Sequence, residues 1–182
     1  MALMAVAVAA AEVPLGKSAR SIAVYLTELR DLVDRATAVR QSWIRDIGKV
    51  ARAVRERDPA AAVEAGVIGA EQLRRFVPFR EMLGQLVPPG PCESCHIAVV
   101  SWLDKQIAAC EVMVEIGQTG NVDLLRGTTG LLAEGRIDTA RFRAEYTNLV
   151  AALNEHLKAR KPARRKVVRW PFGRSRPAES SH

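Results

Sequence analysis

The chain has 182 residues, of which 48% are hydrophobic, 26% are charged and only three are cysteine. This composition supplies one compact domain with a sizeable core, and it excludes collagen-like proteins, low-complexity proteins and small disulfide scaffolds. No apolar run reaches the roughly 20 residues that a membrane-spanning helix needs, so the sequence predicts no transmembrane span.

The net charge of +7 is concentrated near the C-terminus. Nine basic residues and no acidic residue lie between Lys158 and Arg176. When these and Glu179 are set aside, 18 basic and 19 acidic residues remain, so the body of the protein is almost neutral. The basic character therefore belongs to residues 161–182, which we expect to form a flexible tail.

Residues 1–16 are predicted to be an apolar N-terminal extension. Residues 1–11 are wholly apolar and resemble the end of a secretory signal, but no positive charge precedes Lys17. The sequence as written therefore predicts a cytoplasmic protein. Export is the alternative if the true start codon lies upstream of the assigned one.

A heptad pattern predicts one long helix over about residues 17–57. Its second apolar row consists of Leu26, Val33, Ile47 and Val54, and Arg40 interrupts it. Such a pattern is typical of a helix with a coiled-coil-like packing seam. The first row recurs every seven residues and comprises Ile22, Leu29, Ala36, Trp43 and Val50.

Two further helical regions are expected in the middle of the chain. The first begins with Asp58 as its N-cap and Pro59 at its first position, and it runs to about Val87. Its glycines and proline predict a broken or kinked helix, at Gly66, Gly69 and Pro78. The second opens at Pro91 and is expected to end at Gly117, as a C-terminal cap.

A short helix over about residues 121–134 should stop at Gly135, and a last helix over about 138–160 should be capped by Asp138. No segment shows sustained strand alternation. The sequence thus predicts an all-α protein in which residues 17–160 form an up-and-down antiparallel bundle of four to five helices.

One short segment carries residues with metal and redox chemistry. Cys92, Cys95 and His96 form Cys-x-x-Cys-His, which resembles the haem-attachment motif of c-type cytochromes. That resemblance covers five residues and implies two thioether bonds to haem and an imidazole ligand to iron. His156 or Met82 is then a possible sixth ligand, and the function would be electron transfer by an exported protein.

Other interpretations of this segment stay open. Cys92, Cys95 and His96 are also candidate metal ligands, although neighbouring positions on a helix point about 100° apart. A redox-active thiol pair suits a helix N-terminus. Glu93 and His96 form half of a di-iron Glu-x-x-His motif. In the simplest interpretation the cysteines are small buried residues and His96 is a hydrogen-bonded polar group.

The basic tail mixes cations with aromatic residues. Cations neutralise phosphates of nucleic acid or of an anionic membrane, and an aromatic ring stacks on bases or enters a lipid interface. The candidate contact residues are Arg164, Arg165, Lys166, Arg169 and Trp170.

The sequence contains no Gly-x-Ser-x-Gly, no His-Glu-x-x-His and no phosphate-cradling glycine loop. No catalytic constellation is evident, so a non-enzymatic function is favoured. We expect a helical-bundle binding or interaction module with a basic tail, acting on a protein partner or as a homodimer. The alternatives are the haem protein described above and, third, a thiol- or metal-dependent redox protein.

Overall fold

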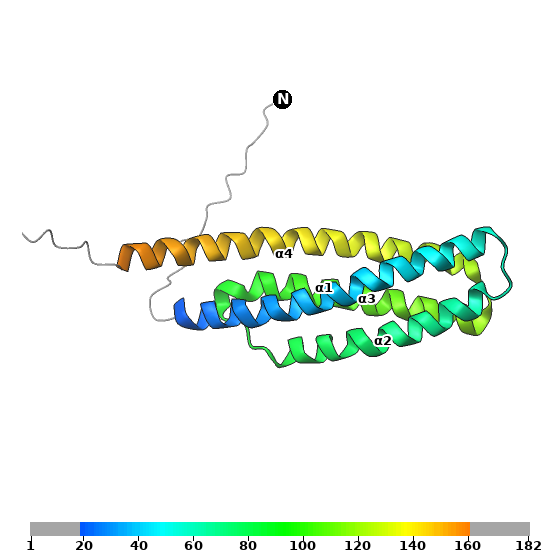
Figure 1. Cartoon of the computed structure of the whole chain (residues 1–182). Helices are drawn as coiled ribbons and strands as arrows, with labels where there is room; N and C mark the ends of the chain where they lie inside the picture. Colours follow the sequence, from blue (N-terminus) through cyan, green and yellow to red (C-terminus); the bar gives the residue numbers. More distant parts are fainter. Residues whose placement is uncertain (1–18, 161–182) are drawn as a thin grey trace, which may run out of the picture.

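The computed structural model describes residues 19–160, which form four long helices running alternately up and down (Figure 1). This part of the chain contains no strand, and the predicted all-α bundle is confirmed with four helices. The predicted N-terminal extension and basic tail lie outside the described residues. The elements are α1 (Ala19–Arg55), α2 (Ala61–Gln85), η1 (Gly90–Cys92), α3 (Glu93–Thr119), η2 (Val122–Leu124) and α4 (Leu125–Arg160).

The heptad seam of α1 faces the core along its whole length. All five residues of the first row, from Ile22 to Val50, are at most 1% exposed. In its middle, the indole of Trp43 packs edge-on against Phe76 of α2, with ring centroids 5.5 Å apart. Burial of this apolar row is the main force that holds α1 on the bundle. The predicted seam is confirmed.

Helix α2 is continuous from Ala61 to Gln85, so of the expected break or kink the break is wrong. A Cβ on Gly66 would lie 2.7 Å from the Cα of Gly117 on α3, and one on Gly69 would lie 2.8 Å from the backbone of Cys110. The glycines therefore allow the backbones of α2 and α3 to approach each other closely. Pro78 lies on the exposed face of α2, inside the helix.

The ends of two helices differ from the predictions. Gly117 does not cap α3, which continues to Thr119 and ends at Gly120 in the left-handed conformation, with φ 72°. Helix α2 begins at Ala61, two residues later than predicted, and Asp58 accepts a hydrogen bond from the backbone N–H of Ala60 at 2.8 Å. Asp58 thus closes the turn before the helix.

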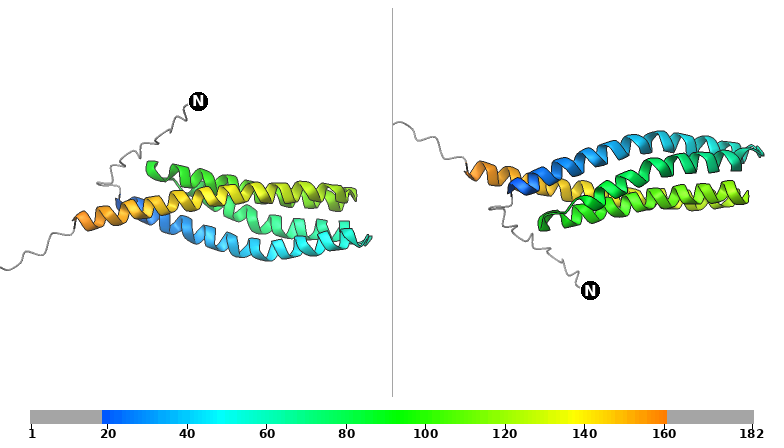
Figure 2. Two further views of the ribbon diagram at one scale, coloured as in Figure 1. Left: turned by 90° about the horizontal axis from the view of Figure 1, so that it is seen from above. Right: turned by 90° about the horizontal axis from the view of Figure 1, so that it is seen from below.

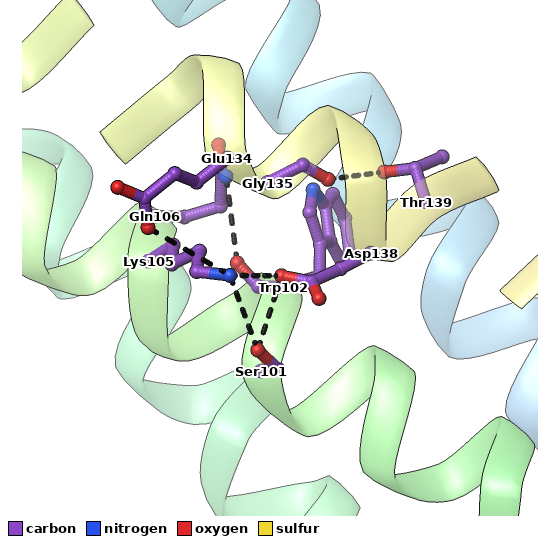
Figure 3. A network of polar contacts seen from close by, with 8 residues as sticks. All are labelled: Ser101, Trp102, Lys105, Gln106, Glu134, Gly135, Asp138 and Thr139. Carbon is purple, nitrogen blue, oxygen red and sulfur yellow. Dashed lines mark hydrogen bonds and ion pairs between the residues drawn. The ribbon is translucent and has the colours of Figure 1, made fainter. Parts of the chain in front are cut away.

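The predicted break between two C-terminal helices is also wrong, because α4 passes through Gly135 and Asp138 without interruption. A Cβ on Gly135 would lie 2.9 Å from the side-chain nitrogen of Gln106, so glycine lets α4 pack closely on α3. Asp138 accepts hydrogen bonds from Ser101 at 3.0 Å and from Lys105 at 2.6 Å (Figure 3). Gly135, predicted to end one helix, and Asp138, predicted to begin the next, both serve the α3–α4 contact instead.

The four helices are not packed equally closely. Helix α3 packs along both α2 and α4, and α1 packs along α2, whereas α1 and α4 approach each other at few places (Figure 2). None of the helices in residues 19–160 has the length and hydropathy to cross a membrane. The backbones of α1 and α4 are therefore further apart than those of the other neighbouring helices.

Candidate functional site

The cysteine–histidine segment lies at the end of the bundle where α1 and α3 begin. Cys92 ends η1, and Cys95 and His96 occupy the first turn of α3. The hydroxyl of Tyr25, on α1, lies 2.8 Å from Nδ1 of His96, and the two rings are 6.3 Å apart at their centroids. Tyr25 is a member of this cluster that the sequence did not reveal, because its partner lies 71 residues away.

All three thiols are buried, with no exposed surface. Burial raises the pKa of Cys92 to about 11, and burial together with the nearby Cys92 thiol and Glu145 raises the pKa of Cys95 to about 12. Burial and Glu111 raise the pKa of Cys110 to about 12. A redox-active cysteine needs a lowered pKa, whereas these thiols are protonated at neutral pH.

The two ring side chains of the cluster are also neutral near pH 7. Burial, and then the charge of Arg80, lowers the pKa of His96. Burial raises the pKa of Tyr25, and the nearby Cys92 and Cys95 raise it further. The cluster therefore consists of two thiols, a phenol and an imidazole, all uncharged, with one hydrogen bond between the rings.

The residues of the haem motif are brought together, but not on an open face. Haem attachment needs both sulfurs at the vinyl groups of the porphyrin, and here neither thiol has exposed surface. The hydrogen bond at Nδ1 of His96 leaves Nε2 as the nitrogen that could bind iron. Covalent haem thus requires the first turn of α3 to open, and it stays a prediction.

The suggested sixth ligands of a haem iron, His156 and Met82, stay predictions from the sequence. Glu145 of α4 lies near Cys95, and His156 follows eleven residues later, about 16 Å further along the helix. His156 Nε2 is buried and has no hydrogen-bond partner within residues 19–160. Met82 lies two residues from Arg80, which pairs with Asp104 of α3 and whose charge also acts on His96.

Residues 19–160 contain no group of three or more His, Cys, Asp or Glu side chains that could hold a metal ion. Glu93, the acidic member of the half di-iron motif, is exposed at the first position of α3. Metal binding by Cys92, Cys95 and His96 therefore stays a prediction from the sequence.

The covalent haem hypothesis has a direct test in the intact mass of the protein purified from its native host under denaturing conditions. A haem protein would show a mass increased by one haem. Because both thiols are buried and protonated in this fold, we expect the unmodified thiols instead. An added haem would show that the start of α3 differs in the native protein.

A polar network joins the middle of α3 to α4. The ammonium of Lys105 lies 2.6 Å from Asp138 and 3.9 Å from Glu134, and Ser101 donates to the same Asp138 carboxylate (Figure 3). Lys105 also donates a hydrogen bond to the hydroxyl of Ser101, at 3.4 Å. The network fastens α3 to α4.

A groove between α1 and α4 is the feature that the sequence did not predict. Two adjoining depressions of about 420 and 380 Å³ share Ala51 and Thr129 as lining residues. Ile47 and Leu132 form a buried apolar floor. We call this feature the α1–α4 groove, and it is lined by Ile44, Ile47, Gly48, Ala51, Val54, Arg55, Val122, Asp123, Leu125, Arg126, Thr129, Leu132, Ala133 and Arg136.

Small residues keep the α1–α4 groove open. A Cβ added to Gly48 would meet no atom within 4 Å, so nothing from α4 fills the space beside it. Gly48 and Ala51 on α1 face Thr129 and Ala133 on α4. The sequence contained a sign of the groove in two small residues of α1, Gly48 and Ala51. It did not show which residues of α4 face them.

Comparison of the chain with family models, with curated proteins and with solved structures finds no match.

Proposed function

We propose that this protein is an interaction module that binds a helix of a partner protein in the α1–α4 groove. The observation that carries the proposal is the groove itself, an open depression between α1 and α4 with an apolar floor at Ile47 and Leu132. Grooves of this kind bind the apolar face of an amphipathic helix in many protein complexes.

The dimensions of the groove support a helix as its occupant. Its α1 side extends from Ile44 to Arg55, which corresponds to about 17 Å or three helical turns. The floor is apolar at Ile47 and Leu132, and charged side chains occupy the margins. A partner helix of about three to four turns would cover this length, and a contact of that size corresponds to weak or transient binding.

Replacing Gly48 with leucine should block the groove without disturbing the fold. Nothing lies within 4 Å of the new Cβ, and leucine favours the helix over glycine by up to about 0.8 kcal/mol. We therefore expect an equal or higher free energy of unfolding together with the loss of partner binding. The measurement is photo-crosslinking in the native host from a photoreactive residue at Ala133, with the adduct identified by mass spectrometry.

Two controls make this result specific. Gly84→Leu places the same side chain on α2, outside the groove, where only a terminal nitrogen of Arg80 lies within 4 Å, at 3.8 Å. It should leave the adduct intact. A photoreactive residue at the exposed Thr27 reports non-specific neighbours. If Ala133 and Thr27 give the same adducts, or if Gly48→Leu leaves the Ala133 adduct unchanged, the groove is not the binding site.

The basic tail is proposed as a second contact, with nucleic acid or an anionic membrane surface. The proposal rests on the sequence of residues 161–182, which combines basic residues with two aromatic residues, Trp170 and Phe172. Deletion of residues 161–182 tests the contact made by the tail separately from the contact made by the α1–α4 groove. If the tail and the groove bind different partners, the deletion should abolish binding to nucleic acid or to an anionic membrane. The adduct formed from Ala133 should remain.

A further inference from the structure

The charges around the α1–α4 groove point to the chemistry of its occupant. Four of its lining residues are ionisable, and three of them are arginines: Arg55, Arg126 and Arg136. Asp123 is the only acidic residue among those that line the groove. The margins are therefore cationic, although the body of the protein is nearly neutral.

A second, independent observation lies at one end of the groove. Arg40, one turn before Ile44 on α1, is half-buried, and its Nε is buried with no hydrogen-bond partner within residues 19–160. Burial, and then the nearby positive charge of Arg136, lowers the pKa of Arg40. A partly desolvated guanidinium beside a second guanidinium is unfavourable until an anion lies between them.

We propose that the occupant of the α1–α4 groove is an acidic amphipathic helix, one carboxylate of which binds Arg40 and Arg136. This inference rests on the proposed function and adds the class of partner. Guanidinium groups match a carboxylate with paired N–H donors, so this end of the groove would fix the register of the bound helix. Carboxylates about three to four turns away would meet Arg55 and Arg126 at the other end.

The geometry specifies a binding motif. Apolar residues at positions i, i+4, i+7 and i+11 would lie on the floor formed by Ile47, Ala51 and Leu132. Glutamates or aspartates would flank this row near its two ends. A cationic helix with the same apolar row would face Arg136, Arg126 and Arg55 with like charge and would be rejected.

The test uses the full chain and two synthetic peptides of about 14 residues, a length that spans the groove. Both carry the same leucine row, one flanked by glutamates and the other by lysines, and binding is measured by fluorescence anisotropy. We expect the glutamate peptide to bind about tenfold more tightly than the lysine peptide, with a preference that shrinks as salt is raised. Arg40→Gln and Arg136→Gln should each reduce the preference several-fold, whereas Arg143→Gln, at an exposed position outside the groove, should not.

The outcomes separate this inference from the proposed function. If both peptides bind equally and Gly48→Leu weakens both, the groove binds helices but the inference about charge is wrong. If the glutamate peptide binds and Gly48→Leu has no effect, the groove is not the site and both fail. If neither peptide binds, the inference is wrong. If sedimentation shows a dimer that Gly48→Leu converts to a monomer, the occupant is a second copy of this chain and the inference is overturned.

Discussion

Replacing Gly117 with alanine is expected to lower the free energy of unfolding by about 2–3 kcal/mol, the usual cost of forcing extra atoms into a packed contact. The new Cβ would lie 2.5 Å from the Cα of Gly66, which is backbone and cannot rotate away. Helices α2 and α3 would have to separate along their whole contact. The measurement is urea denaturation followed by circular dichroism.

Gly48→Ala is the matched control, because it makes the same change in the middle of another helix. Its Cβ meets nothing within 4 Å, so only helix propensity acts, and stability should rise by about 0.5–1 kcal/mol. Opposite signs for the two variants are required if Gly117 is there for a backbone contact. A stabilised Gly117→Ala would mean that α2 and α3 do not meet at these glycines.

The protein is expected to lose stability steeply as the pH rises above 9. The pKa values of Cys92, Cys95 and Cys110 are raised from 9.0 to about 11, 12 and 12 in the folded state. In the unfolded chain the thiols lose their protons first, so ionisation favours unfolding. At about 1.4 kcal/mol per pKa unit, each thiol would cost about 2–3 kcal/mol by pH 11, a large share of the stability of a single domain.

The sign of this effect follows from the direction of the pKa change. A group with a raised pKa in the folded state contributes its full stabilisation below pH 9, and that contribution is lost as the pH rises toward 11–12. The measurement is the free energy of unfolding at pH 8, 9 and 10. This range lies at or below the ordinary pKa of tyrosine, so Tyr25 adds little to the slope.

The control for the alkaline effect is a variant with alanine at all three cysteines. It will be less stable at pH 8, because cavities replace the buried sulfurs, but its stability should be nearly flat between pH 8 and 10. A wild-type protein whose stability is equally flat would show that the thiols are exposed to solvent. Rapid alkylation of Cys92 or Cys95 in the native protein at pH 7.5 would show the same.

The sequence was most informative where one physical effect dominates. A heptad row such as Ile22 to Val50 has a single purpose, burial along one face, and the structure buries each of its members. Glycine was misleading because it signals two things, a helix end and a close backbone approach. Gly117 and Gly135 allow close approach, and only knowledge of the facing residues Gly66 and Gln106 distinguishes the two cases.

The candidate site shows the same limit. The proximity of Cys92, Cys95 and His96 follows from the sequence, but their burial and the hydrogen bond from Tyr25 depend on how α1 lies against α3. The α1–α4 groove belongs to neither helix alone. Its small residues form a groove only because Gly48 of α1 and Ala133 of α4 line the same depression.

The glycine contacts also determine which part of the bundle can yield. Helices α2, α3 and α4 are fixed to one another where backbone meets backbone or glycine meets side chain, at Gly66, Gly69, Gly117 and Gly135. A glycine in such a contact has no side chain that could change its rotamer to accommodate a displacement of the helix. Helix α1 is held by interdigitated side chains, which can exchange rotamers, and Gly48 touches nothing across the gap. We therefore expect α1, rather than α2, α3 or α4, to be the helix whose displacement would change the width of the α1–α4 groove.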